Sequence, residues 1–374
     1  NSYITKKYWG GSYIQNSLFS DFLNAKISWF FSGNISIGSI RANHVFLKLI
    51  TEILIIFFCF SLTRSLNLEK EKEIIFFTII CALALHLNRE ITQYFYPVRF
   101  RDIPLIIFLI FSLRMFTIPK NNYISCLTIG ILSIFSIIWS LEKGIYLNIS
   151  LLCLLFLFFL KKKNKKIFLI SSSIIISWIF FYFMVGNDEF SSFIINTVNI
   201  IRDQDWNHGL IYPAPFIFDF NEHAARGTKS LLIIILNGIL IVELVLNKKS
   251  KVPRQSKLFL CIFFLMALVN YKTGLLRSDS FHMRQGIYFQ FILFIFLLTY
   301  YLTQIRIMNL SNKNKYISNK FVYIIICLFI FTYINQNNFK FGGFKNIKNF
   351  RDRYIDYVSL NDNFFLTNEY INLK

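Results

Sequence analysis

A short stretch at residues 276–286, between two apolar blocks, is dense in charged and hydrogen-bonding side chains. It contains Arg277, Asp279, His282 and Arg284. Arginine binds phosphate oxygens through two parallel hydrogen bonds, and histidine can donate to the same oxygens. Asp279 is suited to orient His282 or to accept a hydrogen bond from a hydroxyl group. We therefore predict a site for a phosphate and a hydroxylated ligand here. The simpler alternative is a solvated loop whose charges pair with lipid head groups.

A second polar cluster ends where a long apolar block begins at Ile103. It comprises Arg99, Arg101 and Asp102. Polar groups at the mouth of a membrane span are often functional, because burying them near lipid is costly. The alternative is that the arginines and the nearby tyrosines only anchor the span at the interface. We predict that the two arginines bind substrate.

Asp21 is the only acid before the first apolar block of the sequence. A carboxylate can accept the proton of an attacking hydroxyl group. Asp21 and Asp102 are therefore the candidate catalytic bases. The aromatic residues around Asp21 indicate an ordered segment beside the membrane.

The longest polar segment, residues 186–230, divides into two parts. In the first part, apolar residues recur at helical spacing, which predicts an amphipathic helix lying in the membrane interface. These residues are Phe190, Phe193, Ile194, Val198 and Ile201. The second part contains glycines and prolines that break helices, which indicates an ordered loop that either covers a substrate or is plain surface. Its carboxylates and histidines match no standard metal spacing, so we expect no metal and no cofactor, although a divalent metal is compatible with them.

Long apolar blocks must position these residues. Of 374 residues, 55% are hydrophobic and 16% are charged, whereas about 25% are charged in a soluble domain. A helix needs about 20 residues to cross about 30 Å of hydrocarbon, and about ten blocks are long enough or nearly so. They are residues 45–63, 74–87, 103–118, 123–140, 144–160, 167–185, 231–246, 257–275, 287–305 and 319–335. We predict an all-α integral membrane protein, a bundle of about ten transmembrane helices with outer-face loops and an interfacial helix.

Basic residues give the orientation of these spans. Lysine and arginine concentrate in short loops that contain no acid, at residues 161–166, 247–257 and 306–320. Such loops stay in the cytoplasm, so the net charge of +20 reflects topology, and no nucleic-acid partner is expected. We divide the chain into an outer first-loop segment (1–44), a transmembrane domain (45–335, with the outer loop 186–230) and a short outer tail (336–374).

Together these features resemble the GT-C superfamily of membrane glycosyltransferases, in particular bacterial members with a dolichyl-phosphate-mannose-transferase-like layout. The resemblance lies in the outer first segment that ends at Gly38–Arg41, the cluster Arg99–Asp102 at the mouth of a span, and the late loop Arg277–Arg284. It covers most of the chain as a layout.

This resemblance implies transfer of a sugar from a polyprenyl-phosphate carrier to an envelope glycan or lipid acceptor. The reaction would take place on the periplasmic or exterior face of the bacterial inner membrane, with membrane lipids as further partners. The family's general base is an acid just after the first span, and basic residues in later outer loops hold the phosphate. No such span precedes Asp21, so we expect an N-terminally truncated chain.

Two alternatives stay open from the sequence. An O-antigen polymerase- or ligase-like protein would place the 186–230 loop at the centre, with Arg202, His208 and Arg226 as its key residues. A non-enzymatic transporter or flippase would need polar residues lining a path between the spans, and the spans are nearly all apolar.

Overall fold

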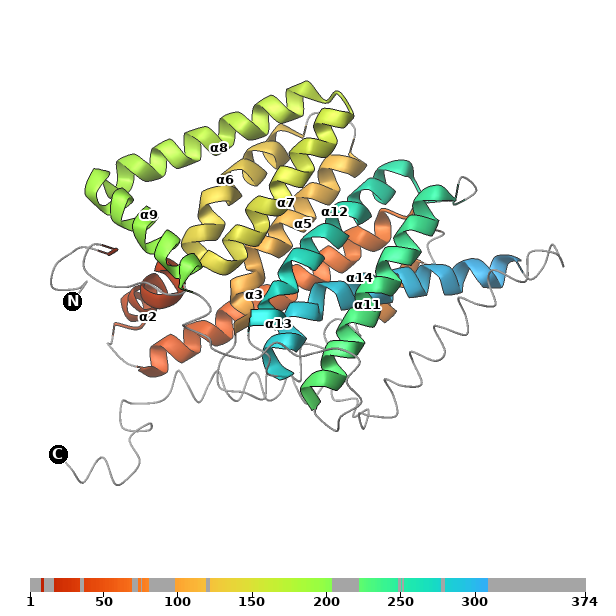
Figure 1. Cartoon of the computed structure of the whole chain (residues 1–374), viewed down its shortest axis with the longest axis horizontal. Helices are drawn as coiled ribbons and strands as arrows, with labels where there is room; N and C mark the ends of the chain where they lie inside the picture. The colour runs from red at the N-terminus through yellow and green to blue at the C-terminus, as the bar shows by residue number, and fades with distance from the viewer. Residues whose placement is uncertain are drawn as a thin grey trace.

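The computed structural model describes a bundle of helices (Figure 1). It covers residues 8–9, 17–33, 37–68, 73–74, 76–80, 98–118, 122–203, 222–247, 250, 252–276 and 280–308, at some of which only the backbone is described. Every regular element within these ranges is helical. The elements are η1 (Phe19–Leu23), α2 (Asn24–Ser32), α3 (Ile37–Arg64), η2 (Val98–Asp102), α5 (Ile103–Thr117), α6 (Tyr123–Trp139), α7 (Leu141–Leu160), α8 (Asn164–Val185), α9 (Asn187–Arg202), α11 (Glu222–Leu246), α12 (Arg254–Asn270), α13 (Lys272–Leu276) and α14 (Ser280–Met308).

Five helical stretches in the described ranges are long and apolar enough to cross a membrane. They are Gly38–Arg64, Leu141–Leu160, Asn164–Val185, Gly227–Leu246 and Arg254–Leu275. Shorter apolar helices are Tyr123–Trp139 and Gln285–Tyr301. The all-α class predicted from the sequence is thereby confirmed for the described residues, and the five apolar helices suggest a membrane protein. The count of about ten spans stays a prediction, because block 319–335 and much of block 74–87 lie outside the described residues.

Successive helices of the bundle run in opposite directions, so that their turns gather at two ends (Figure 1). The turns α5–α6, α7–α8 and α11–α12 lie at one of them, which we call the basic end. It carries Arg64, Lys161, Lys162, Lys163 and Arg254. At the opposite end α5 and α7 begin and α12 ends. This agrees with the sequence-based expectation for the basic loops 161–166 and 247–257, whereas most of the loop 306–320 lies outside the described residues.

Helix α5 is the central element of the bundle. It packs against α3, α6, α7 and α12, and most of its residues are buried, apart from a stripe formed by Ile107, Phe111 and Arg114. Its apolar run is uninterrupted from Ile103 to Phe111, and Pro104 is tolerated because it falls in the first turn, where backbone N–H groups have no helical partner. A helix that is apolar over most of its surface belongs in the interior.

Two glycines allow neighbouring helices to approach closely. A Cβ on Gly144 would lie 2.6 Å from the Cα of Ile137, where α6 turns into α7. A Cβ on Gly286 would lie 2.8 Å from the backbone nitrogen of Gly274, where α14 crosses α13. Small residues serve this purpose in membrane bundles, where association depends on close contact of the helices.

Helices α8 and α9 form a V at the periphery of the bundle (Figure 1). The amphipathic helix predicted in the 186–230 segment is confirmed as α9, although its place at the membrane interface stays a prediction. Phe193 is buried against Trp9 and Phe181, with ring centroids 5.1 and 5.4 Å away. The exposed apolar residues of α9 are Ile194, Ile195, Val198 and Ile201.

Candidate functional site

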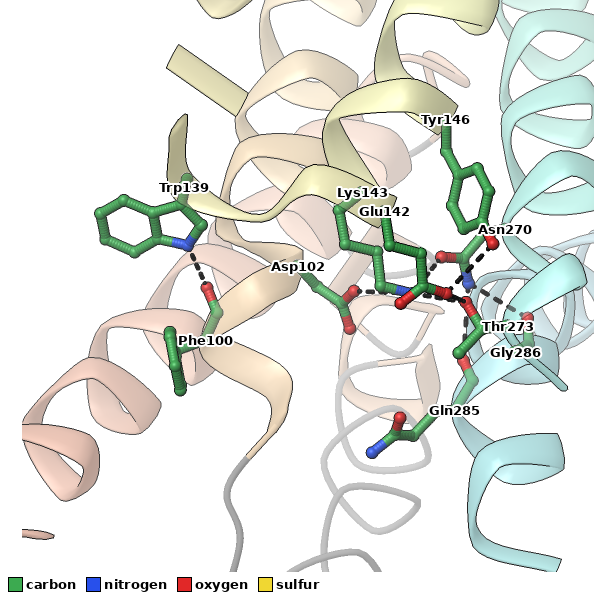
Figure 2. A network of polar contacts seen from close by, with 10 residues as sticks. All are labelled: Phe100, Asp102, Trp139, Glu142, Lys143, Tyr146, Asn270, Thr273, Gln285 and Gly286. Carbon is green, nitrogen blue, oxygen red and sulfur yellow. Dashed lines mark hydrogen bonds and ion pairs between the residues drawn. The ribbon is translucent and has the colours of Figure 1, made fainter. Parts of the chain in front are cut away.

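Polar and charged side chains from separate parts of the chain converge at the end opposite the basic end. Figure 2 shows them extending toward one another from η2, α7, α12 and α13. They are Asp102, Glu142, Lys143, Tyr146, Asn270 and Thr273, which we call the Lys143 cluster. We call this end of the bundle the site end.

Lys143 lies in the first turn of α7 and is only 3% exposed. Its Nζ donates hydrogen bonds to Asn270 Oδ1 and Thr273 Oγ1, both at 2.8 Å, and lies 3.6 Å from Asp102 Oδ1. A buried charge is strongly unfavourable unless it is paired and hydrogen-bonded. Two of the three ammonium donors are used in hydrogen bonds, and Asp102 adds an ion pair, so Lys143 joins η2, α12 and α13 to α7.

Glu142 precedes Lys143 and is held by hydroxyl groups. Its Oε1 accepts a hydrogen bond from Thr273 Oγ1 at 2.5 Å and one from Tyr146 OH at 3.0 Å. Thr273 can do this while accepting from Lys143, because a hydroxyl group has one donor and two acceptor positions. Both hydrogen bonds to Glu142 end on the same oxygen, and the side chain is half-buried. The carboxylate is therefore fixed in orientation.

Asn270 closes the cluster on the side of α14. Its Nδ2 donates to the backbone oxygen of Gly286 at 3.1 Å. Gln285, which precedes Gly286 in α14, is 6% exposed, and its Nε2 has no hydrogen-bond partner among the described residues. In Figure 2 the Gln285 amide extends away from Asn270 and Thr273. A buried amide donor without a partner is rare in proteins and calls for an explanation.

Trp139 holds the N-terminal segment beside this cluster. Ser17 and Ser20 donate hydrogen bonds to the Trp139 backbone oxygen at 2.6 and 2.9 Å. The Phe19 ring stacks on the indole ring of Trp139, with the ring centroids 3.7 Å apart. The indole Nε1 of Trp139 donates to the backbone oxygen of Phe100 at 2.7 Å (Figure 2). Trp139 therefore brings η1 next to η2, although they are far apart in the sequence.

His44 lies in the same region, next to two arginines. Its ring stacks on Phe100, with centroids 5.1 Å apart, and its Nε2 contacts Nδ2 of Asn24. Arg41 and Arg101 are near enough to act electrostatically on His44, and Arg101 also acts on Glu142. Positive charge therefore continues from the Lys143 cluster to the start of α3.

The structure places some of the predicted site residues and leaves others outside its description. Asp102 belongs to the Lys143 cluster, and Arg101 lies beside it. His282 is half-buried near the start of α14. Only the backbone is described at Asp21, Arg99 and Arg284, and Arg277 and Asp279 lie outside the described residues. The predicted roles of these residues therefore stay predictions.

Sequence reasoning missed the central members of the cluster. Glu142 and Lys143 fall between the predicted apolar blocks 123–140 and 144–160, whereas they lie in the first turn of α7. Asn270 and Thr273 were hidden within the block 257–275, which the structure divides into α12 and α13. One signal in the sequence could have indicated this site: two adjacent charged residues lie between apolar blocks that are too close together to be joined by a separate loop.

The 186–230 segment is described only in part. At the end of α9, Arg202 and Asp203 form an exposed ion pair at 2.8 Å, and this hydrogen bond lowers the pKa of Asp203. Asp205 and His208 lie outside the described residues. Among the residues that the structure describes, no group of three or more histidine, cysteine, aspartate or glutamate side chains could hold a metal ion.

Comparison of the chain with protein-family models, curated proteins and solved structures found no match in any of the three.

Proposed function

We propose that the protein is a membrane glycosyltransferase that moves a sugar from a polyprenyl-phosphate carrier to an envelope glycan or lipid acceptor. The Lys143 cluster is the observation that supports this most. It gathers two carboxylates, a buried ammonium group and neutral hydrogen-bonding groups at one end of an apolar bundle. Polar groups of this kind are costly in a membrane protein and mark functional sites.

The position of the cluster supports a reaction on the non-cytoplasmic face. The basic end carries the lysine-rich turns, which remain in the cytoplasm according to the positive-inside rule. The Lys143 cluster lies at the opposite end. In a bacterial cell this end would face the periplasm or exterior, where envelope acceptors and flipped lipid-linked sugars are found.

The chemistry needs a proton acceptor and a stabilising positive charge. A carboxylate takes the proton of the acceptor hydroxyl group, and cationic side chains stabilise the phosphate that leaves. Asp21 and Asp102 are the bases predicted from the sequence, but the Asp102 carboxylate is already engaged with Lys143. We therefore propose that Asp102 positions Lys143, while Arg101 and the 277–284 loop bind the carrier phosphate.

The purified protein, reconstituted in lipid nanodiscs, provides the test. It is mixed with a panel of polyprenyl-phosphate sugars and a crude envelope-lipid fraction as acceptor, and free polyprenyl phosphate is measured. We expect release by the wild type and a loss of at least about tenfold in Asp279→Ala and His282→Ala, because each removes a proposed ligand contact. A protein inactive with every donor would contradict the proposal and favour the polymerase or transporter alternatives.

A further inference from the structure

We infer that Glu142 is the group that takes the proton from the acceptor hydroxyl, through its carboxylate oxygen Oε2. This inference rests on the proposed function and names the base within it. It differs from the expectation based on sequence, which assigned that role to Asp21 or Asp102.

The hydrogen bonds of Glu142 are those of an oriented base. Thr273 and Tyr146 both donate to Oε1, so the carboxylate cannot rotate without losing two hydrogen bonds. Oε2 receives neither of them. A general base has to hold one acceptor atom in a fixed position toward the reacting proton, and this arrangement does so.

The other carboxylate of the cluster is less suited to accept a proton. Asp102 is 7% exposed and lies 3.6 Å from the Lys143 ammonium group. Protonating it would leave Lys143 without its charged partner in a buried position, which is unfavourable. Glu142 is also acted on by the Lys143 charge, but it forms no direct ion pair with it, and its hydrogen bonds come from two hydroxyl groups.

Gln285 is a second buried polar group at the site end that calls for a ligand, although its amide extends away from Asn270 and Thr273. Its side chain is buried, with the residue only 6% exposed, and its Nε2 has no hydrogen-bond partner in the described part of the chain. Its backbone oxygen accepts from Asn270 Nδ2 at 3.5 Å, which ties it to the cluster. A ligand oxygen, from a hydroxyl group or a phosphate, would satisfy this donor.

In the proposed step two bonds break and two bonds form. The acceptor O–H bond breaks, and its proton moves to Oε2 of Glu142. The acceptor oxygen forms a bond to the anomeric carbon of the sugar. The bond between that carbon and the phosphate oxygen breaks, and its electron pair remains on the polyprenyl phosphate, beside the cationic surrounding that includes Arg101.

The test compares Glu142→Gln with the wild type in nanodiscs, using the donor and acceptor that give the highest wild-type rate. This substitution keeps the side-chain volume, and the amide oxygen can still accept from Thr273 and Tyr146, but the amide cannot take the proton. We expect kcat to fall at least about 100-fold, while binding of the lipid-linked donor changes less than about threefold. Glu52→Gln on α3 is the matched control, because Glu52 pairs with Lys48 at 3.9 Å outside the cluster.

Chemical rescue makes the test independent of subtle folding defects. Formate should restore part of the activity of Glu142→Ala, because a small carboxylate can occupy the vacated position, and none of the activity of Glu142→Gln. Gln285→Leu should raise KM at least about tenfold, since it leaves a ligand oxygen without its donor.

The outcomes separate this inference from the proposed function. If the wild type transfers sugar and Glu142→Gln retains kcat within about threefold, Glu142 is not the base and the proposed function stands. If the wild type is inactive with every donor, the proposed function fails, and the inference fails with it.

Discussion

Lys143 is the residue whose replacement should affect the structure most. Lys143→Met keeps a long apolar stem but removes the ammonium group that three partners share. Asp102, 7% exposed, is then left as a buried carboxylate without its charged partner. Removing one partner of a buried ion pair costs about 3–5 kcal/mol. We expect the free energy of unfolding to fall by that amount.

A double-mutant cycle tests the physical reason for this loss. The unfolding free energy of the wild type, Lys143→Met, Asp102→Asn and the double variant is measured in mixed micelles by denaturant titration with tryptophan fluorescence. Because the two side chains are in direct contact, we expect a coupling energy of about 1–3 kcal/mol, so that the double variant is more stable than the sum of the single effects.

A matched substitution outside the cluster is the control for this cycle. Lys48→Met removes a cation whose partner is Glu52, in a partly exposed pair on one helix, and should cost less than about 1 kcal/mol. If Lys143→Met is as mild as this control, or if the coupling to Asp102 is near zero, Lys143 does not hold the site end together as described.

Three further substitutions test individual contacts. Gly286→Ala forces a Cβ to within 2.8 Å of the Gly274 nitrogen and should cost about 1–3 kcal/mol of unfolding free energy in the same titration. Trp139→Phe removes the 2.7 Å hydrogen bond to the Phe100 oxygen. We expect the free energy of unfolding to fall by about 1 kcal/mol and the N-terminal segment to be digested faster by a protease. Unchanged proteolysis would contradict the role of Trp139 in holding this segment. Asn237→Leu removes the hydrogen bonds from α11 to α14 and should cost about 0.6–1.7 kcal/mol, whereas a gain in stability would show that these bonds contribute nothing.

The helices could be predicted from the sequence where apolar residues run without interruption. Block 103–118 corresponds to α5, Ile103–Thr117, and block 123–140 to α6, Tyr123–Trp139. In both, the apolar run ends where the helix ends, because the surrounding lipid and protein interior exclude polar backbone ends. Composition and spacing therefore suffice for these elements.

The start of α7 could not be predicted in the same way. Glu142 and Lys143 are charged, which led us to place them in a connection, but they are helical because partners elsewhere in the chain compensate their charges. Those partners come from η2, α12 and α13. Their contacts depend on how distant helices pack, and no local pattern in the sequence encodes that.

The fold brings together two of the segments that the sequence singled out. The segment that contains Asp21 and the segment that contains Asp102 both dock on Trp139. The sequence indicated the first as an ordered, aromatic segment beside the membrane and the second as a polar cluster at the mouth of a span. The tryptophan that joins them lies at the end of an apolar block, and the sequence gave no sign of this role.

Sugar transfer by the reconstituted protein can be measured together with release of the carrier. The reconstituted wild-type protein is given a polyprenyl-phosphate sugar labelled in the sugar, together with the acceptor fraction, and both free polyprenyl phosphate and labelled acceptor are quantified over time. We expect one polyprenyl phosphate to be released for each sugar transferred, and both products to be lost together in Glu142→Gln. Release of the carrier without labelled acceptor, or movement of the intact lipid-linked sugar across the bilayer without release, would contradict it.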